Sequence, residues 1–317
     1  MSSELSHVLS DAALLGDAAR LVGSRYCPLI ALVDADGRVT GVVPEEKVRL
    51  GLIRTARPEH PLASLAEPAE GFPELPLSAE QRPLPCHPPA PPAIPRALVM
   101  AGGRGTRLEH LTENLPKPLL AVRGEPLLHR ILRQLAQAGI REVLLSVHYL
   151  AGKIRASVGD GGAFGLCVRY LEEVRPLGTA GALGLAEAAD DPLLVMNGDI
   201  LTTIHFPSFF AWHARHRNSA TIAANLFQVE VPYGLAHFDE QTLEHLEEKP
   251  TLSLPVNAGI YLFEAELLGM VPANEPFDMV SWLNELAPAR KLGLFPVVEE
   301  WTDIGSLARF EEADGNR

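Results

Sequence analysis

The sequence predicts an α/β fold in which a mostly parallel, mixed β-sheet is flanked by helices. Short, fully apolar runs at 97–100, 143–147 and 193–196 are typical of strands that are buried on both faces. Between the first two runs, apolar residues from Leu127 to Leu135 recur at helical spacing. Alternation of buried strands with amphipathic helices predicts a sheet covered on both faces. Ligands of such sheets bind at the carboxyl ends of the strands.

The other elements follow in the same chain order. The helix that begins at Pro126 should end at Gly139, because glycine favours helix ends. We next expect a short helix around Ile154, a strand over 167–171 and a helix from Ala180 to Ala189. Beyond Asp199 we expect a helix over 209–216, strands over 220–227, 234–238, 243–247 and 256–263, a helix over 277–287, a strand over 294–298 and a helix from 306. The part of the chain beyond Asp199 is expected to form the second side of a cleft.

The first 57 residues carry a small α/β pattern of their own. An amphipathic stretch near Leu14 precedes apolar runs at 29–33 and 39–43, which a D-A-D-G turn joins. A charged helix is expected over 45–53. This pattern resembles one CBS module, but Lys47 stands where the resemblance implies an aspartate in modules that bind adenosine ligands. The sequence therefore departs from the nucleotide-binding form of that module.

Prolines separate this module from the rest of the chain. Twelve of the 27 prolines lie between Pro58 and Pro95, and repeated prolines favour an extended backbone without sheet hydrogen bonds. We predict three parts: a CBS-like module over 1–57, a proline-rich linker or degraded second CBS module over 58–95, and the main domain over 96–317.

Composition restricts the class of protein. With 317 residues, 47% of them hydrophobic, and no apolar run near the roughly 20 residues that span a bilayer, we expect a cytoplasmic protein without a membrane partner. The formal net charge of −13 argues against a nucleic-acid partner, so a polyanion must be held by local positive charge. Three widely spaced cysteines predict reduced thiols. The assembly state, including a homo-oligomer, is left open.

The stretch from Ala97 to Leu120 combines glycines with positive charge. After the apolar strand, glycines at 102, 103 and 105 let the backbone approach a ligand, and Arg107 and Lys117 follow. A P-loop is excluded because no Gly-Lys-Ser or Gly-Lys-Thr occurs here. The dinucleotide fingerprint is disfavoured because Leu108 occupies its third glycine position. The stretch is therefore interpreted as a polyphosphate-binding loop of another kind.

Further blocks occur in order beyond this loop. They are P-L-G-T-A-G-A-L (176–183), M-N-G-D (196–199), E-E-K-P (247–250), N-A-G-I-Y (257–261) and W-T-D-I-G (301–305). Together with G-G-R-G-T-R-L and L-P-K-P-L-L, they resemble the sugar-1-phosphate nucleotidylyltransferases, in particular GDP-mannose pyrophosphorylase-like members. The resemblance covers residues 96 to about 310 and implies a Rossmann-like sheet of the nucleotide-diphospho-sugar transferase type.

The resemblance implies roles for residues of each block. Arg107 and Lys117 would bind the triphosphate, and Lys117 would also reach the attacking phosphate. Asp199 and Asp303 complete the implied catalytic set and would share Mg²⁺, a hard cation that prefers oxygen ligands. The implied nucleotide-binding residues are Ala101, Gly102, Gly103, Gly105, Thr106, Gly178 and Thr179. The implied sugar-phosphate-binding residues are Tyr233, Gly234, Glu248, Lys249, Asn257 and Gly259.

These residue types suit one reaction. An oxygen of a sugar 1-phosphate attacks the α-phosphorus of a nucleoside triphosphate, and pyrophosphate leaves. The resemblance favours GTP with a mannose-, heptose- or glucosamine-type 1-phosphate. Two alternatives stay open: a non-catalytic regulatory subunit that senses a sugar nucleotide, and a nucleotidyltransferase that uses a non-sugar phosphate. His213 and His216 have the spacing of metal ligands on one helix face, but without a third ligand we expect them to be solvent-exposed.

Overall fold

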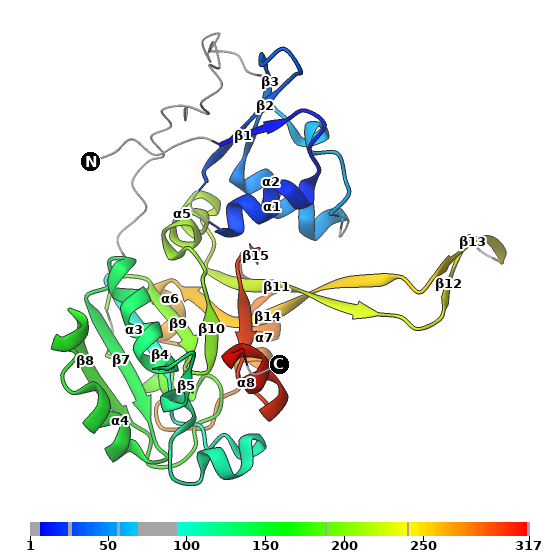
Figure 1. Cartoon of the computed structure of the whole chain (residues 1–317). Coiled ribbons are helices and arrows are strands. Elements are labelled where there is room, and N and C mark those ends of the chain that lie inside the picture. Colours follow the sequence, from blue (N-terminus) through cyan, green and yellow to red (C-terminus); the bar gives the residue numbers. More distant parts are fainter. Residues whose placement is uncertain are drawn as a thin grey trace. The chain divides into compact units, whose positions relative to one another are not determined.

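The computed structural model describes residues 7–24, 27–55, 58–68, 94–187, 189–239 and 241–315. These residues fall into two units (Figure 1). Unit 1 takes its described residues from 7–68, 224–257 and 296–299, and unit 2 takes them from 94–223, 258–295 and 300–315. Most of the predicted linker, 69–93, lies outside the described residues. In the part of the chain that is described, no helix is long and apolar enough to cross a membrane.

A seven-stranded sheet in the order β15-β11-β14-β9-β4-β7-β8 is the centre of unit 2. The strands are β4 (Arg96–Met100), β7 (Glu142–Val147), β8 (Cys167–Glu172), β9 (Leu193–Asn197), β11 (Ala220–Glu230), β14 (Thr251–Phe263) and β15 (Leu292–Val297). β4 pairs in parallel with both β7 and β9, and β7 pairs in parallel with β8. β14 pairs antiparallel with β9. The predicted mostly parallel, mixed sheet is thus confirmed.

Alternate side chains of a strand point to opposite faces of the sheet, and in these strands the side chains on both faces are buried. Helices therefore cover both faces of the sheet. One face packs on a core that includes Leu98 and Val195 from the strands and Trp282 from α7 (Met279–Leu286). In Figure 1, α3 (Leu127–Gln137) lies in front of β4 and β7, and its five apolar side chains are buried. The other helices are α4 (Ala151–Val158), α5 (Phe206–His216), α6 (Ala265–Leu268) and α8 (Leu307–Asp314).

The helix predicted over 180–189 is wrong. The structure has a short 3₁₀ helix, η5 (Gly181–Leu185), after which Ala186 is extended. Gly181 and Gly184 approach the segment around Pro272 so closely that an added Cβ would collide with its backbone carbonyls. Close packing of small residues therefore overrides the helical spacing, because glycine itself disfavours a helix.

Two short strand pairs position chain segments at the end of the sheet. β5 (Ala121–Val122) pairs with β6 (Glu125–Pro126), and β10 (Ile200–Thr202) pairs antiparallel with β16 (Trp301–Asp303). In the second pair Asp303 lies opposite Ile200, and the Ile304 amide donates to the Asp199 carbonyl at 2.9 Å. Asp199, which directly precedes β10, and Asp303, at the end of β16, thus lie on neighbouring segments although they are distant in the sequence.

The N-terminal part of unit 1 is a three-stranded sheet with two helices. β1 (His7–Ser10) pairs in parallel with β2 (Leu29–Val33), which pairs antiparallel with β3 (Val39–Pro44). Helices α1 (Leu15–Ser24) and α2 (Glu45–Thr55) share one apolar core with these strands. The sequence did not predict β1. Residues 58–68, expected in the linker, hydrogen-bond to this part, for example through Val42 and Glu67. The domain boundaries and the CBS-like assignment stay predictions.

In unit 1, the two strands expected over 234–238 and 243–247 form a hairpin. β12 (Gly234–Asp239) pairs antiparallel with β13 (Thr242–Glu248), and a register shift follows His237. The hairpin continues from the outer halves of β11 and β14.

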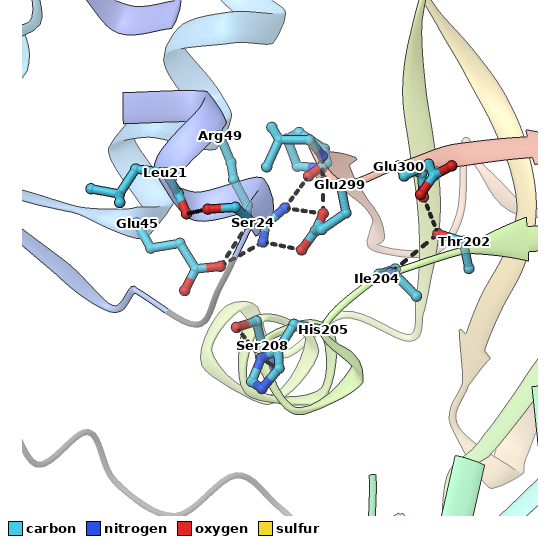
Figure 2. Close-up of polar contacts among 12 residues, drawn as sticks. Leu21, Ser24, Glu45, Arg49, Thr202, Ile204, His205, Ser208, Glu299 and Glu300 are labelled. Atoms are coloured by element: carbon cyan, nitrogen blue, oxygen red, sulfur yellow. Dashed lines mark hydrogen bonds and ion pairs between the residues drawn. The ribbon is translucent and has the colours of Figure 1, made fainter. Parts of the chain in front are cut away.

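A buried ionic cluster lies within unit 1, between α2 and Glu299 (Figure 2). The Arg49 guanidinium on α2 donates to both carboxylate oxygens of Glu299, at 2.9 and 2.6 Å, and to the Pro296 carbonyl at 2.8 Å. Its Nε donates to Glu45 at 2.8 Å. The Arg49 side chain is 1% exposed and that of Glu299 is 2% exposed. Burial alone would lower the pKa of Arg49, but hydrogen bonds and charge from Glu299 and Glu45 raise it, so the guanidinium stays charged.

Replacing Arg49 with methionine should lower the free energy of unfolding by about 3–5 kcal/mol, because Glu299 would stay buried without its cation. Lys47→Met on the same helix is the matched control. Its pair with Glu67 is more than a third exposed on both sides, so it should cost no more than about 1 kcal/mol. Urea denaturation measures both variants, and equal losses would contradict the prediction.

Candidate active site

A cavity of about 460 Å³ lies in unit 2 at the carboxyl ends of β4 and β9. Its lining brings together nine of the residues predicted from the sequence: Ala101, Gly102, Gly103, Gly105, Arg107, Lys117, Gly178, Thr179 and Asp199. It also includes Glu173, Asn197 and Gly305. Adjacent parallel strands end at the same edge of a sheet, so loops that are about a hundred residues apart in the sequence meet there.

The glycine loop is shaped by local contacts. Gly105 has φ +65°, a left-handed conformation that favours glycine, and it precedes the 3₁₀ helix η2 (Thr106–Thr112). The Thr112 hydroxyl donates to the Gly105 carbonyl at 3.1 Å. A Cβ on Gly105 would lie 3.1 Å from the Lys117 Cβ, so glycine permits the close approach of these two parts of the loop. Arg107 is exposed at the edge of the cavity.

Lys117 forms an ion pair with Asp199 inside the cavity. Lys117 begins the 3₁₀ helix η3 (Lys117–Leu119) after Pro116, and its side chain is 11% exposed. Asp199 lies two residues after the end of β9, and the intervening Gly198 amide donates to the Met100 carbonyl at 2.8 Å. A positive and a negative group are thus held side by side between two strand ends, which is an arrangement suited to phosphate and a cation together.

Asp303, the last residue of β16, lies near the Lys117–Asp199 ion pair. Among the described residues the cavity lining includes Gly305 but not Asp303 itself. The Asp303 carboxylate forms an ion pair with Arg309 of α8, and Gly305 leaves room for that carboxylate. The structure therefore places Asp303 beside the cavity, on the strand adjacent to the one that follows Asp199.

The loop with Gly178 and Thr179 is fixed against α7. Gly178 has φ +81°, and a Cβ there would lie 2.8 Å from the Phe277 carbonyl oxygen. The Thr179 hydroxyl donates to Asp278 at 3.0 Å and accepts from the Met279 amide at 2.8 Å. Hydrogen bonds from the Ser281 amide and hydroxyl and from Thr179 lower the pKa of Asp278. This wall of the cavity is rigid because its polar groups are paired.

Glu173 is a cavity residue that the sequence analysis missed. It follows β8 and is 8% exposed, the Leu177 amide donates to its Oε2 at 3.0 Å, and the Ser146 hydroxyl donates to its Oε1. A Cβ on Gly102 would lie 2.8 Å from the Glu173 Oε1, so this carboxylate sits against the glycine loop. Its position after a predicted parallel strand was the only signal available.

Asn197 is a second cavity residue without a predicted role. A Cβ on Gly259 would lie 2.6 Å from the Asn197 Nδ2, and Gly259 has φ +70°. Gly259, predicted for the sugar phosphate, therefore adjoins the cavity wall through Asn197.

The remaining predicted sugar-phosphate residues belong to unit 1. Gly234 and Glu248 are partners at the base of the β12–β13 hairpin, and the Lys249 amide donates to the Tyr233 carbonyl at 3.2 Å. Lys249 has φ +47°, and Tyr233 is 74% exposed. These four residues thus lie together, and Asn257 lies on β14 two residues before Gly259. Their binding roles stay predictions.

A glycine-lined cavity with cationic and carboxylate groups at the ends of a mainly parallel sheet is typical of phosphate-binding α/β proteins. The nucleotidyl transferase family model matches residues 96–316, so the chain belongs to this family. A solved structure of a Bacillus anthracis protein assigned as a glucose-1-phosphate thymidylyltransferase has the same fold. It is 24% identical, the TM-score is 0.57, and the match covers 70% of this chain and 94% of that one.

Curated relatives agree with the family. Mannose-1-phosphate guanylyltransferase of Mycobacterium tuberculosis is 34% identical over 231 residues, which cover 68% of this chain and 62% of that protein. The catalytic subunit beta of the Drosophila melanogaster mannose-1-phosphate guanylyltransferase is 32% identical over 223 residues, covering 68% and 60%. The chain therefore matches about three fifths of the length of these relatives.

The expected exposure of the histidine pair is wrong for His213, which is 2% exposed. Its Nδ1 lies 2.7 Å from the Thr221 hydroxyl oxygen and its Nε2 lies 3.0 Å from a Glu264 carboxylate oxygen. The described residues contain no group of three metal-ligating side chains. Burial lowers the pKa of His213, although the Glu264 carboxylate opposes this shift.

This lowered pKa predicts acid sensitivity of the fold. The pKa of a histidine in the unfolded chain is about 6.5, and the pKa of His213 in the folded protein is lower. As the pH drops below about 6.5, the unfolded chain binds a proton that folded His213 does not bind. The free energy of unfolding therefore falls as the pH drops toward the pKa of folded His213. Between pH 7.5 and pH 5.5, the free energy of unfolding of the His213→Gln variant should therefore fall less than that of the wild type. Denaturant titrations at both pH values test this, and an equal loss in the two proteins would refute it.

Proposed function

We propose that this protein transfers a nucleotidyl group from a nucleoside triphosphate to a sugar 1-phosphate, giving an NDP-sugar and pyrophosphate. One observation carries the proposal: Arg107, Lys117 and Asp199 converge with the glycine loop on one cavity. The two relatives named as mannose-1-phosphate guanylyltransferases support this chemistry. Family membership and the fold agree with it.

The residues suit an in-line displacement. An oxygen of the sugar phosphate forms a bond to the α-phosphorus, the bond from that phosphorus to the bridging oxygen breaks, and pyrophosphate carries the electron pair away. Lys117 and Arg107 supply positive charge where two polyanions meet and where charge develops on the leaving oxygens. Loop amides from 103–106 orient the phosphates. The chain forms no covalent bond to the substrate in this scheme.

The carboxylates fit a divalent cation, and we propose Mg²⁺. Asp199 and Asp303 come from adjacent segments, and carboxylate oxygens are the ligands that a hard cation prefers. Each carboxylate has a basic partner, Lys117 or Arg309, which would exchange its contact for phosphate when the substrates bind. The cation would neutralise phosphate charge during transfer.

Residues of unit 1 would bind the second substrate. Lys249 would hold the phosphate of the sugar 1-phosphate and Glu248 would accept its hydroxyls, with Tyr233, Gly234, Asn257 and Gly259 beside them. Their grouping at the base of one hairpin supports this role. The N-terminal sheet with α1 and α2 would be a CBS-like appendage of structural or regulatory role.

Glu173 supports guanine as the base. Guanine presents adjacent N1–H and N2–H donors, which match the two oxygens of a carboxylate, whereas uracil and thymine present one N–H between two carbonyls. Each carboxylate oxygen of Glu173 accepts one hydrogen bond from the chain and has capacity for another. A buried acceptor left unpaired would disfavour the wrong base.

Lys117→Ala and Asp199→Asn should each reduce kcat by about a hundredfold or more, because each removes charge at the reacting phosphates. Lys153→Ala is the control, since that lysine is exposed and outside the cavity lining. Pyrophosphate release with Mg²⁺, GTP and mannose 1-phosphate measures all three, with circular dichroism to check folding. Turnover at the wild-type level in both site variants would refute the proposal.

Glu173→Gln should lower the ratio of kcat/KM for GTP over that for UTP by about tenfold or more, because an amide offers only one acceptor atom to the two guanine donors. Glu172→Gln is the matched control, since Glu172 is 68% exposed and pairs with Arg155. Steady-state kinetics with each nucleotide measure the ratio. An unchanged ratio in Glu173→Gln would remove Glu173 from base selection.

A further inference from the structure

Tyr149 lies beside the glycine loop, and both belong to unit 2. It comes two residues after the end of β7, which pairs in parallel with β4, so the carboxyl ends of these two strands lie at the same edge of the sheet. The glycine loop follows β4 and leads into η2, which carries Arg107. Within the described part of the chain, the residues that line the cavity do not include Tyr149. An effect of Tyr149 on the site must therefore act through the loop.

Tyr149 contacts this loop at its beginning, its middle and its end. The Tyr149 amide donates to the Gly102 carbonyl at 3.4 Å. The Arg104 guanidinium lies over the Tyr149 ring, 5.7 Å from the ring centroid, which is within the range of a cation–π contact. The Tyr149 hydroxyl has one proton to donate, and the carbonyls of Glu113, at 2.8 Å, and Thr112, at 3.2 Å, share it. One residue thus contacts the loop at both ends.

The Tyr149 hydroxyl binds the carboxyl end of η2. The last carbonyls of a helix have no partner inside that helix, and Thr112 is the last residue of η2 while Glu113 is its C-cap. Inside the loop, the Leu108 amide and the Thr112 hydroxyl donate to the Gly105 carbonyl at 2.9 and 3.1 Å. These internal bonds shape the loop, whereas the Tyr149 hydroxyl ties η2 to the segment that follows β7.

The turn that carries Tyr149 has a strained backbone. Leu150, the N-cap of α4, has φ +52°, a left-handed conformation that is uncommon for residues other than glycine. Such a conformation persists only where the surrounding contacts fix it, and strained residues gather at functional sites. The strain at Leu150 is independent of the hydrogen bonds of Tyr149, and it supports a role for the position of this turn.

Phosphate binding by the loop depends on its backbone. Phosphate oxygens accept hydrogen bonds from successive amides, so these amides must point toward one place. The amides of 103–106 and the Arg107 side chain lie in the sequence between the points that Tyr149 contacts. Holding a loop in its binding conformation raises affinity because less chain entropy is lost on binding. The contacts of Tyr149 thus enclose the whole predicted phosphate-binding segment.

We infer that Tyr149 is a positioning residue for the polyphosphate: by holding the loop at Gly102 and at Thr112–Glu113, it sets the direction of the loop amides and the position of Arg107. The inference rests on the proposed function, because it takes the ligand of this loop to be the triphosphate of a nucleotide. It assigns the affinity for the phosphates partly to a side chain outside the cavity lining.

Tyr149→Phe tests the inference because phenylalanine keeps the ring and loses the hydroxyl. Inorganic tripolyphosphate and pyrophosphate are the probes, and titration calorimetry at a fixed Mg²⁺ concentration measures their binding. The variant should bind both probes about three- to tenfold more weakly than the wild type. Hydrogen exchange of peptides over 102–113 should become about threefold faster or more. The KM for the nucleoside triphosphate should rise with the loss of affinity, while the KM for the sugar 1-phosphate changes less than twofold.

Tyr170→Phe is the matched control. Tyr170 lies on β8, its hydroxyl donates to the Gly159 carbonyl at 2.6 Å, and the Arg155 guanidinium lies 4.4 Å from its ring centroid. The control therefore loses the same kind of hydrogen bond from a ring with the same kind of neighbour, away from the glycine loop. It should match the wild type in tripolyphosphate affinity and in exchange over 102–113. Equal tripolyphosphate affinity in the two variants would overturn the inference.

The proposed function fails separately. If the wild type binds tripolyphosphate but releases no pyrophosphate with any substrate pair, the transfer reaction is refuted, and the comparison of binding still decides the role of Tyr149. If the wild type binds neither probe, the loop is not a phosphate site and the inference is overturned. Weaker binding in Tyr149→Phe without faster exchange over 102–113 would show that the hydroxyl does not act through the loop, and would also overturn it.

Discussion

The parallel pairing of β4 with β9 is the constraint on which the site depends. It brings the glycine loop after Met100 and the Asn197–Asp199 turn to the same edge of the sheet. There Lys117 meets Asp199, and β10 extends the second segment toward its pairing with β16 and Asp303. Charged groups from three distant parts of the chain are thus brought to one edge of the sheet. The arrangement is suited to binding phosphates because it places positive charge and glycine-loop backbone at one cavity.

Much of this could be predicted from sequence because the patterns were strong and local. Fully apolar strands such as 97–100 and an amphipathic helix such as 127–137 left few alternatives for the fold. Nine predicted residues meet in one cavity, because the glycine loop follows β4 and Asp199 follows β9, and these adjacent parallel strands end at the same edge of the sheet. The role of each residue stays a prediction.

The parts that could not be predicted depend on contacts between distant segments. In place of the helix expected over 180–189 there is only a short 3₁₀ helix, Gly181–Leu185, because Gly184 packs on the backbone near Pro272. His213 is buried because Thr221 and Glu264 satisfy its ring nitrogens, and neither is adjacent in sequence. Glu173 belongs to no motif block, and only the cavity reveals it. Arg49 forms hydrogen bonds with Glu299, which is 250 residues away in the sequence. The local pattern of apolar residues does not predict such contacts between distant residues.

The proposed reaction is the transfer of a nucleotidyl group to a sugar 1-phosphate bound at this cavity. The most direct measurement incubates the protein with Mg²⁺, each nucleoside triphosphate in turn and a panel of sugar 1-phosphates, and follows pyrophosphate. The account predicts release that requires both substrates, with GTP and a mannose-, heptose- or glucosamine-type 1-phosphate as the best pair. Absence of release with every pair would contradict it and would favour a regulatory subunit of the same fold.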